Sequence, residues 1–362
     1  MKIANIVGAR PNFMKIAPIQ RRMVQSEKIT PILIHTGQHY DEKMSKTFFV
    51  DLGLPEPDVY LGVGSGSHAQ QTADVMVKME VWLIEHRPDL LLVVGDVNST
   101  LAASLAASKV GVPVAHVEAG LRSRDRTMPE EINRIVTDTI ADHLFVTEQS
   151  GLDNLRREGV DDGKIHFVGN VMIDSLVEHL QKASTLPTLS QFGVTERAYA
   201  LMTLHRPSNV DNEQVLRRIF TALAVIEKDM PIIFPMHPRT RKMLSAFGLE
   251  SELKSMNVII TEPLGYLPFL QLMSRAKLVL TDSGGIQEET TFLKIPCLTM
   301  RENTERPVTV TLGTNQLVGM NPDDILDGYH AAMNGAPAGA QIPPLWDGQA
   351  SKRIVEILEK LV

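Results

Sequence analysis

The sequence predicts an α/β protein with two domains, each built around a parallel β-sheet. Short apolar runs of strand length alternate with amphipathic stretches of helix length, and this rhythm stops at residues 181–198 and then restarts. The interrupting segment is polar and contains the turn-forming residues Pro187, Gly193 and Thr195. With 362 residues, the chain is also too long for one ordinary core and suits two α/β domains of typical size.

Strands and helices alternate through the first half of the chain. The strands are expected at 3–7, 29–37, 90–96, 112–120, 143–147 and 165–169, and the helices at 13–25, 68–86, 98–110, 129–141 and 151–158. Strands such as 90–94 are continuously apolar, which is typical of strands buried on both faces. This half therefore predicts a parallel sheet with helices on both of its faces.

The second half repeats the pattern. Its strands are expected at 199–205, 231–236, 257–261, 278–280 and 295–300, with helices at 211–227, after Arg239, at 266–274 and after Gly285. A further helix follows Pro322, and the Gly/Pro/Ala-rich stretch 332–344 precedes a last amphipathic helix. We therefore predict domains at 1–180 and 181–345, and a terminal helix at 346–362 that packs back on one of the sheets.

The composition restricts the class of protein. Apolar residues make up 43% and charged residues 22% of the chain, as in globular proteins, and the net charge of -7 offers no basic face to nucleic acid. Cys297 is the single cysteine and lies in an apolar strand, so we expect a buried thiol and no disulfide or cysteine-based metal site. Residues 1–10 lack the features of a signal peptide, and no apolar run is long enough to span a membrane, so a cytoplasmic protein without a membrane partner is expected.

Residues 278–285 combine an apolar strand, a turn and the start of a helix. The adjacent Gly284 and Gly285 let backbone N–H groups approach a ligand closely, and Ser283 can donate its hydroxyl. Because a helix N-terminus favours anions, a phosphate is the expected ligand. The alternative is an ordinary tight turn between a strand and a helix.

Glu289 lies about one turn into the same helix. A carboxylate there would repel a phosphate but could accept the two hydroxyls of a ribose. Arg301 and Arg306 follow the next strand and should emerge at the same edge of the sheet. Together these residues predict a nucleotide-binding site.

Other polar side chains also follow predicted strands. They are Arg10, Asp96 and Glu118 in the first domain, and His205 and His237 in the second. In open parallel sheets, ligands bind beyond the carboxyl ends of the strands. We expect that two such sheets, facing each other across a cleft, bring these strand ends together.

Asp96 and Glu118 are candidates for general acid–base catalysis, because each follows a strongly apolar strand. Other roles remain open for both. Asp96 could cap the helix that Asn98 opens, and Glu118 could pair with Arg122 or Arg124.

Glu130 and Glu131 are further acid–base candidates, although the helix dipole alone favours acidic residues in the first turn of a helix that begins at Pro129. His205 could act in catalysis or could be a hydrogen-bonded loop histidine. The remaining singled-out histidines are expected to be structural: His35, His39 and His116. No histidine spacing suits a metal, so no metal or other cofactor is expected.

Nine motifs, in this order along the chain, together resemble a known family. They are Arg10-Pro11, HTGQHYD (35–41), GDVNST (95–100), HVEAGLRS (116–123), MPEEINR (128–134), His205-Arg206, EPLGYLPF (262–269), TDSGGIQEE (281–289) and RENTERP (301–307). The family is that of the non-hydrolysing UDP-N-acetylglucosamine 2-epimerases. The resemblance implies the glycosyltransferase-B architecture, with two Rossmann-like domains around a central cleft and a C-terminal helix that returns to the first domain.

The resemblance also implies an isomerase that interconverts UDP-GlcNAc and UDP-ManNAc for polysaccharide biosynthesis, usually as a homodimer. UDP is eliminated to leave a 2-acetamidoglucal and then adds back. The matching positions imply acid–base roles for Asp96, Glu118 and Glu130, and assistance from His205 near the leaving diphosphate. The implied substrate-binding residues are Arg10, Lys15, Leu264, Phe269, Ser283, Gly284, Gly285, Glu289 and Arg306.

Two departures from the family pattern bear on substrate and regulation. The run HRPSNVD (205–211) also resembles relatives that act on UDP-2,3-diacetamido-2,3-dideoxyglucuronate. Members that UDP-GlcNAc activates allosterically carry Gln-His-Arg-Gln at positions 38–41 and an arginine near Gln70, where this chain differs. The alternative functions are a UDP-sugar glycosyltransferase, a hydrolysing relative, or a nucleotide-sugar sensor without catalysis.

Overall fold

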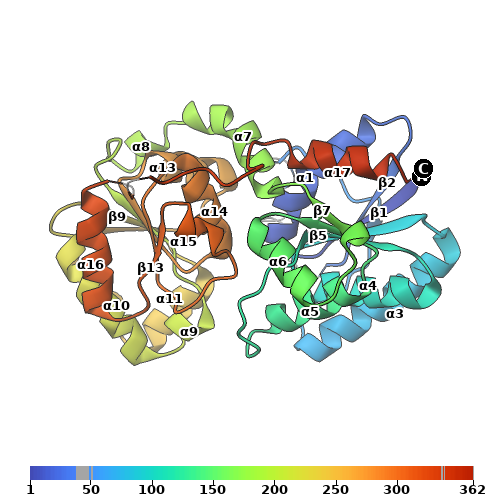
Figure 1. Cartoon of the computed structure of the whole chain (residues 1–362). Coiled ribbons are helices and arrows are strands. Elements are labelled where there is room, and N and C mark those ends of the chain that lie inside the picture. Colours follow the sequence, from blue (N-terminus) through green and yellow to red (C-terminus); the bar gives the residue numbers. More distant parts are fainter. Residues whose placement is uncertain (38–48, 50–51, 336, 338, 362) are drawn as a thin grey trace. The chain divides into compact units, whose positions relative to one another are not determined.

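The computed structural model describes residues 1–37, 49, 52–335, 337 and 339–361 (Figure 1). These residues form two compact units. The first unit contains residues 1–178 and 344–362, and the second contains residues 179–343. Each unit is built on one parallel sheet, as the sequence predicts.

The sheet of the first unit has seven parallel strands in the order β3-β2-β1-β4-β5-β6-β7. The strands are β1 (Lys2–Val7), β2 (Thr30–His35), β3 (Val59–Tyr60), β4 (Leu90–Val94), β5 (Val114–Ala119), β6 (His143–Val146) and β7 (Ile165–Phe167). The chain moves outward from β1 in one direction and from β4 in the other, which creates a topological switch point between these two strands. Ligand sites in such sheets lie at the carboxyl ends of the strands beside that point.

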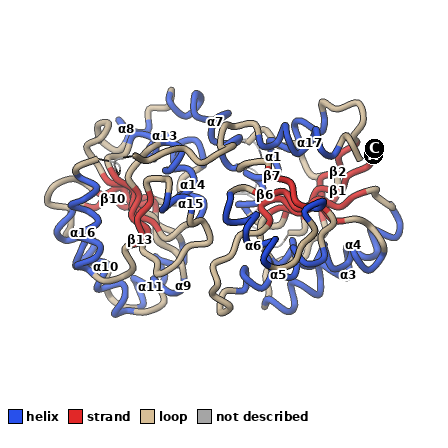
Figure 2. Tube along the Cα trace, viewed as in Figure 1, coloured by secondary structure: helices blue, strands red, loops and turns tan. Residues whose placement is uncertain are grey.

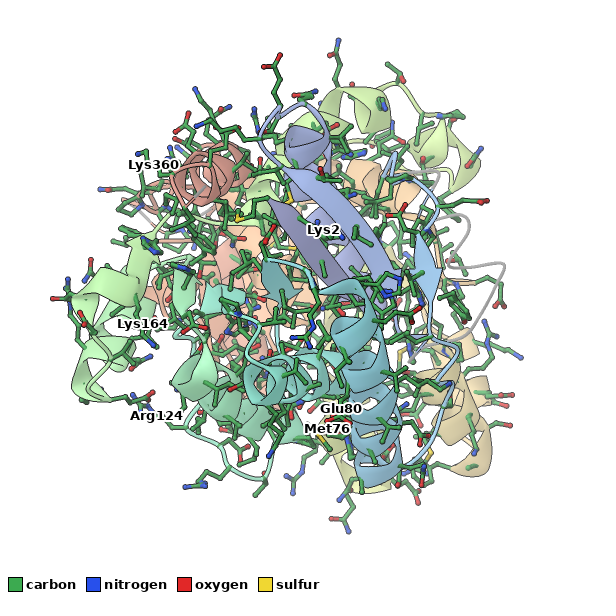
Figure 3. All side chains as sticks on the ribbon, turned by 90° about the vertical axis from the view of Figure 1, so that its right-hand side faces the viewer. Lys2, Met76, Glu80, Arg124, Lys164 and Lys360 are labelled. Atoms are coloured by element: carbon green, nitrogen blue, oxygen red, sulfur yellow. The ribbon has the colours of Figure 1, made fainter. Side chains whose placement is uncertain are left out.

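Helices cover both faces of the first sheet (Figure 2). They are α1 (Arg10–Val24), α3 (His68–His86), α4 (Asn98–Val110), α5 (Pro129–Ile140), α6 (Gln149–Arg157), α7 (Val171–Ser184) and α17 (Ala350–Leu358), with a short 3₁₀ turn at Asp162–Lys164. Figure 3 shows α3, which carries Met76 and Glu80, and the C-terminal end of the chain with Lys360 on opposite sides of this sheet. The continuously apolar strand β4 is buried along its whole length between these layers.

The C-terminal segment belongs to the first unit. The Asp174 carboxylate on α7 accepts hydrogen bonds from the backbone N–H groups of Ala350 and Ser351, at 3.0 and 2.7 Å. It thereby satisfies N–H groups that the first turn of a helix leaves without partners. The buried Trp346 donates its indole N–H to the carbonyl of Thr147 at 2.9 Å. The predicted helix start at Trp346 is therefore wrong: the helix begins at Ala350, and Trp346 is an anchor that precedes it.

The second unit has six parallel strands in the order β10-β9-β8-β11-β12-β13. The strands are β8 (Ala200–Met202), β9 (Ile232–Pro235), β10 (Val258–Thr261), β11 (Leu278–Thr281), β12 (Cys297–Thr299) and β13 (Asn315–Leu317). The helices are α8 (Thr188–Gln191), α9 (Pro207–Val210), α10 (Glu213–Ile226), α11 (Pro238–Ala246), α12 (Glu250–Lys254), α13 (Tyr266–Arg275), α14 (Gly284–Leu293), α15 (Val308–Thr311) and α16 (Pro322–Met333). One core forms where α10 and α16 pack on the apolar side chains of β8, β9, β11 and β12.

Three further expectations concern the described residues. Cys297 is fully buried in β12, as the sequence predicts, and burial raises the pKa of its thiol to about 11. Throughout the part of the chain that the structure describes, every helix is too short or too polar to cross a membrane. The same residues contain no group of three or more histidine, cysteine, aspartate or glutamate side chains arranged to hold a metal ion.

Candidate active site

The carboxyl ends of β4 and β5 carry the predicted carboxylates Asp96 and Glu118. Glu118 is the last but one residue of β5, where the pairing register with β6 shifts, and its backbone is left-handed with φ of 75°. An irregularity of this kind re-aims a side chain at the end of a strand. It turns Glu118 toward α1 of the same unit.

Glu118 forms an ion pair with Lys15 of α1. Both side chains are buried, with exposed fractions of 3% and 5%. Two charges taken out of water stabilise a fold only when each has a partner, so the pair acts as one element. The alternative pairing of Glu118 with Arg122 or Arg124 is wrong, since Lys15 supplies this contact, and Arg122 pairs with other carboxylates.

Asp96 follows β4 by two residues and is held by two residues of α5. Arg134 donates from Nη1 to its carboxylate, and Asn133 donates to its backbone carbonyl at 2.8 Å. The alternative that Asp96 caps α4 is wrong, because Val97 occupies the cap position without a side-chain hydrogen bond. About a quarter of the Asp96 side chain remains exposed, so it is accessible to a ligand.

Glu130 and Glu131 are neighbours on α5 with different surroundings. Glu131 is buried and accepts hydrogen bonds from the backbone N–H groups of Ser123 and Arg124 and from the Arg134 guanidinium. Burial disfavours its charged form, but these donors outweigh burial and lower its pKa. Glu131 therefore fixes the loop before α5, whereas the side chain of the half-buried Glu130 makes no hydrogen bond or ion pair with another described residue.

Arg10, His35 and His39 are further residues singled out from the sequence. Arg10 is the first residue of α1, and its side chain lies outside the described part of the structure. His39 lies outside it as well. His35 is buried against the rings of Phe13 and Tyr60, and burial lowers its pKa to about 4, as suits a structural histidine.

In the second unit, His205 and Asp282 follow the neighbouring strands β8 and β11. The ring nitrogen Nδ1 of His205 lies 2.9 Å from Oδ1 of Asp282. The other carboxylate oxygen accepts the backbone N–H groups of His205 and Arg206, both at 2.8 Å. Asp282 is fully buried; burial alone would raise its pKa, but His205 and these N–H groups lower it. The ionised carboxylate of Asp282 therefore orients the imidazole of His205.

Helix α14 begins at Gly284, directly after Ser283. A Cβ atom at Gly284 would come within 2.7 Å of Glu305 Oε1 and 3.0 Å of Arg306 Nη1. The missing side chain therefore lets this ion pair lie against the helix N-terminus. The predicted Ser283, Gly284 and Gly285 are all half-buried at this end of the sheet.

Three arginines surround Glu305 beside this helix N-terminus. Arg306 Nη1 lies 2.7 Å, Arg301 Nη2 2.8 Å and Arg206 Nη2 3.7 Å from its carboxylate oxygens. Burial would raise the pKa of Glu305, but the three cations hold it well below its usual range. Arg301 is 5% exposed, and its Nη1 has no hydrogen-bond partner among the described residues. Together with the helix N-terminus, this cationic cluster is suited to binding phosphate groups.

Glu289 lies on α14 and accepts a hydrogen bond of 2.9 Å from the hydroxyl of Tyr266 on α13. Burial raises its pKa to about 8, and the neighbouring charge of Glu288 adds to the shift. Leu264 precedes α13 and Phe269 lies within it, so both are close in sequence to Tyr266. Both side chains are half-buried.

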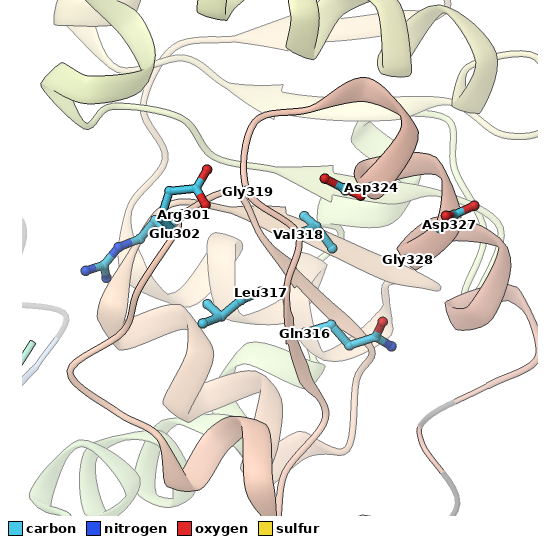
Figure 4. Close-up of a pocket in the computed structure, with 9 residues that line it drawn as sticks. All are labelled: Arg301, Glu302, Gln316, Leu317, Val318, Gly319, Asp324, Asp327 and Gly328. Carbon is cyan, nitrogen blue, oxygen red and sulfur yellow. The ribbon is translucent and has the colours of Figure 1, made fainter.

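A pocket of about 340 Å³ opens beyond β12 and β13 (Figure 4). Its lining residues are Arg301, Glu302, Gln316, Leu317, Val318, Gly319, Asp324, Asp327 and Gly328. The guanidinium of Arg301 points away from the carboxylates of Asp324 and Asp327 in this view. The pocket is thus lined by carboxylates, an amide and apolar side chains, whereas the three arginines around Glu305 lie beside the start of α14.

Sequence reasoning missed several residues of these clusters. Asp282, Tyr266, Glu305 and Arg134 each hold a predicted residue in place. Asp282 could have been found, because it immediately precedes the Ser-Gly-Gly turn. Nothing in the sequence indicates that Arg134 reaches Asp96, 38 residues away.

Each unit has a parallel sheet whose carboxyl edge carries charged groups, carboxylates in the first unit and an arginine-lined helix N-terminus in the second, which is typical of α/β enzymes whose ligands contain phosphate. The family model described as UDP-N-acetylglucosamine 2-epimerase matches residues 21–359. The chain belongs to this family of epimerases.

Individual relatives agree with this assignment over full length. The UDP-N-acetylglucosamine 2-epimerase of Methanocaldococcus jannaschii is 44% identical over 364 residues, which cover 99% of each chain. The UDP-2,3-diacetamido-2,3-dideoxy-D-glucuronate 2-epimerase of Pseudomonas aeruginosa is 42% identical over 365 residues, covering 100% of each. A crystal structure of the M. jannaschii enzyme in complex with UDP-GlcNAc and UDP superposes with a TM-score of 0.90 at 43% identity, and the match covers 99% of this chain and 100% of that one.

Proposed function

We propose that this protein interconverts UDP-GlcNAc and UDP-ManNAc by eliminating and re-adding UDP. The observation that carries the proposal is its match to the epimerase of M. jannaschii along essentially the whole of both chains. The carboxylates of the first unit and the cationic helix N-terminus of the second supply the two kinds of group that the reaction needs: acids and bases at the sugar, and cations at the diphosphate.

The reaction inverts C2 through an unsaturated intermediate. A carboxylate removes the proton from C2, the electron pair forms a C1–C2 double bond, and the C1–O bond breaks with its electrons going to UDP. This elimination gives the intermediate 2-acetamidoglucal. A protonated carboxyl group then delivers a proton to the opposite face of C2, and the UDP oxygen bonds to C1 again.

In this proposal Asp96, Glu118 and Glu130 are the acid–base groups. A general acid or base must be held in position and must remain able to exchange a proton. Asp96 is held by Arg134 and is partly exposed, Glu118 is held by Lys15, and Glu130 is half-buried at the start of α5. Lys15 would tune Glu118 and contact the substrate beside it.

The second unit would bind the nucleotide. Arg306, Ser283, Gly284 and Gly285 would hold the diphosphate, together with Arg10 of the first unit. Glu289 would accept the ribose hydroxyls, and Leu264 and Phe269 would bind the uracil. His205, oriented by Asp282, would donate a proton or a hydrogen bond to the leaving diphosphate.

The decisive experiment incubates the purified protein with UDP-GlcNAc in heavy water. We expect deuterium at C2 of the recovered UDP-sugar and the appearance of UDP-ManNAc, both followed by NMR. Recovery of unlabelled substrate would contradict the proposal. Accumulation of UDP with free ManNAc would indicate a hydrolysing enzyme, and transfer to an added acceptor would indicate a glycosyltransferase.

A second substrate should be tested in the same way. The relative from P. aeruginosa named for UDP-2,3-diacetamido-2,3-dideoxy-D-glucuronate is nearly as similar as the relatives named for UDP-GlcNAc. The ratio of kcat/KM for the two UDP-sugars measures which one this protein prefers. We expect the larger value for UDP-GlcNAc.

We also propose that the protein works as a homodimer, as its sequence motifs imply. Light scattering of the eluting peak in size-exclusion chromatography measures the mass directly. We expect twice the 40.1 kDa of one chain, and the mass of a single chain would contradict this part of the proposal.

A further inference from the structure

His116 lies on β5 and is completely buried. Its ring nitrogen Nε2 is 2.8 Å from the backbone carbonyl oxygen of Gly95, and Nδ1 is 2.6 Å from Oδ1 of Asp138 on α5. The sequence suggests only a structural role for this histidine. Its partners, however, connect it to the end of β4, directly before Asp96.

Both partners of the His116 ring accept hydrogen bonds. A backbone carbonyl can only accept, so Nε2 must carry a proton. Asp138 also accepts from the backbone N–H of Gly120 at 3.0 Å and from Arg122 at 2.7 Å. Burial would raise the pKa of Asp138, but His116 and Arg122 lower it. Asp138 thus holds the Nδ1 side of the ring at 2.6 Å while Nε2–H is directed to the Gly95 carbonyl.

Paired charged groups surround the His116 ring. Asp138 faces it from α5, and the Arg122 guanidinium lies on the far side of Asp138 and pairs in turn with Glu158. On the side of Gly95 lie Lys15 of α1 and Glu118 of β5, which pair with each other. A buried charge is tolerated only when it is paired and hydrogen-bonded in this way.

Both backbone polar groups of Gly95 are hydrogen-bonded. Its N–H donates to the carbonyl of Val117 at 3.0 Å, and its carbonyl accepts from His116. Its backbone is left-handed with φ of 68°, and a Cβ atom there would lie 2.9 Å from Lys15 Nζ and 3.3 Å from Glu118 Oε2. The Gly95–Asp96 peptide is therefore fixed against the buried ion pair of Glu118.

We propose that His116, held by Asp138, is a positioning residue that fixes the Gly95–Asp96 peptide and so sets the placement of Asp96 relative to Glu118. This inference rests on the proposed function, in which these two carboxylates exchange protons with the sugar. His116 does not touch the substrate. It acts by holding the Gly95 backbone, which places Asp96 beside Glu118.

Two other histidines of the same sheet provide a comparison. His143 begins β6, and His166 lies on β7, where their rings stack at 5.7 Å. Burial lowers the pKa of both, and neither His143 Nδ1 nor His166 Nε2 has a hydrogen-bond partner among the described residues. His143 stands at the amino end of its strand, away from the carboxylates, and is a matched control.

The kinetic test compares His116→Phe, His116→Gln and His143→Gln in the C2 deuterium-exchange assay. Phenylalanine fills the space but donates nothing, so we expect kcat to fall roughly 10²-fold with little change in KM, as a small misplacement of a catalytic group does. Glutamine keeps one donor for the Gly95 carbonyl and should recover part of the loss. His143→Gln should behave as the parent. Parent-like kcat in both His116 variants would overturn the inference.

A second measurement does not depend on activity. In protein labelled with ¹⁵N at histidine, we expect a ring Nε2–H signal from His116 at pH 7 that exchanges slowly with solvent, assigned by its loss in His116→Gln. Absence or rapid exchange of this signal would overturn the inference even if the kinetics agreed. If the parent failed to exchange deuterium, the proposed function would fall, whereas a slowly exchanging Nε2–H signal would still show that His116 clamps Gly95.

Discussion

The Asp282 carboxylate holds both the ring and the backbone of His205. Oδ1 lies 2.9 Å from the ring nitrogen Nδ1, and Oδ2 accepts the His205 backbone N–H at 2.8 Å. A carboxylate at this distance favours the tautomer with the proton on Nδ1, which leaves Nε2 for a ligand. Nε2 makes no hydrogen bond or ion pair with another residue in the described part of the chain.

Replacing Asp282 with asparagine should impair turnover. The asparagine amide would present N–H to Nδ1 and favour the opposite tautomer, so we expect kcat to fall roughly 10²-fold or more. Steady-state epimerisation kinetics measure this. The control is Asp211→Asn, which removes an exposed carboxylate paired with Arg239 and should leave kcat unchanged. Equal kcat in the two variants would show that Asp282 does not orient His205 for catalysis.

Lys15→Met should destabilise the first unit strongly, because it removes the cation that pairs with the buried Glu118 carboxylate. Breaking a buried pair in this way costs about 3–5 kcal/mol. In the double variant Lys15→Met/Glu118→Gln, most of the loss should be recovered, since both charges of the pair are then removed. Urea unfolding followed by circular dichroism measures both.

The matched control for this prediction is Lys352→Met. Lys352 pairs with Glu356 on an exposed face of α17, with about half of each side chain in solvent. Loss of an exposed pair changes stability by less than about 1 kcal/mol. If Lys15→Met behaved like Lys352→Met, the buried pair would not contribute as described.

Gly284→Ala should weaken UDP binding. The new Cβ atom would displace the Glu305–Arg306 pair, because it would approach both side chains to 3.0 Å or closer. We expect a loss of affinity of about tenfold, or about 1.4 kcal/mol, in isothermal titration calorimetry with UDP. Gly66→Ala is the control, because its nearest neighbours would be 3.6 Å away, an ordinary contact. Unchanged UDP affinity in Gly284→Ala would contradict the placement of the phosphate site.

Glu289 should make stability fall as the pH rises. Its pKa is about 8 in the folded protein and near 4.5 when unfolded, so between these values the folded state keeps a proton that the unfolded state has lost. The free energy of unfolding should therefore decrease with pH over this window, by up to about 1.4 kcal/mol per unit from this residue. Below pH 4.5 its contribution is constant.

Glu289→Gln tests this pH dependence. Glutamine carries no charge but can still accept the hydrogen bond of Tyr266. Urea unfolding between pH 5 and 8 should give a flatter profile for the variant than for the parent. Parallel profiles would mean that Glu289 is ionised in the folded protein at neutral pH.

Cys297 should be unreactive until the chain unfolds. The thiol is fully buried and its pKa is about 11, so very little nucleophilic thiolate is present at pH 8. In buffer, a chromogenic disulfide reagent should react slowly and modify less than one thiol per chain. In about 6 M guanidinium it should react rapidly with one thiol per chain. Rapid reaction of the native protein would contradict the buried position.

The sheets could be predicted to the extent that their strands are apolar runs. Leu90–Val94 and Leu278–Thr281 were found because full burial requires a continuous apolar sequence. Strands β3 and β13 were not predicted, because two or three residues carry no detectable period. The short helices α8, α9, α12 and α15 were missed for the same reason.

Some parts of the candidate site could be predicted from the sequence and others could not. Asp96, Glu118 and Gly284 could be found because strand ends and glycine turns are visible in the sequence. The contacts of Asp96 with Arg134 and of Glu118 with Lys15 could not be predicted, because ion pairs between residues 38 and 103 positions apart leave no local pattern. The alternative roles for Asp96 and Glu118 were decided only by these contacts.

The sequence by itself determined the α/β class, the strand ends that carry ionisable groups and the helix N-terminus suited to an anion, because periodicity and turn chemistry are local. The tertiary structure alone decided which charge meets which: Lys15 with Glu118, Asp282 with His205, and Asp138 with His116. The reason is physical. A charge removed from water must find a partner through space, and parallel strands bring together residues that the chain keeps far apart.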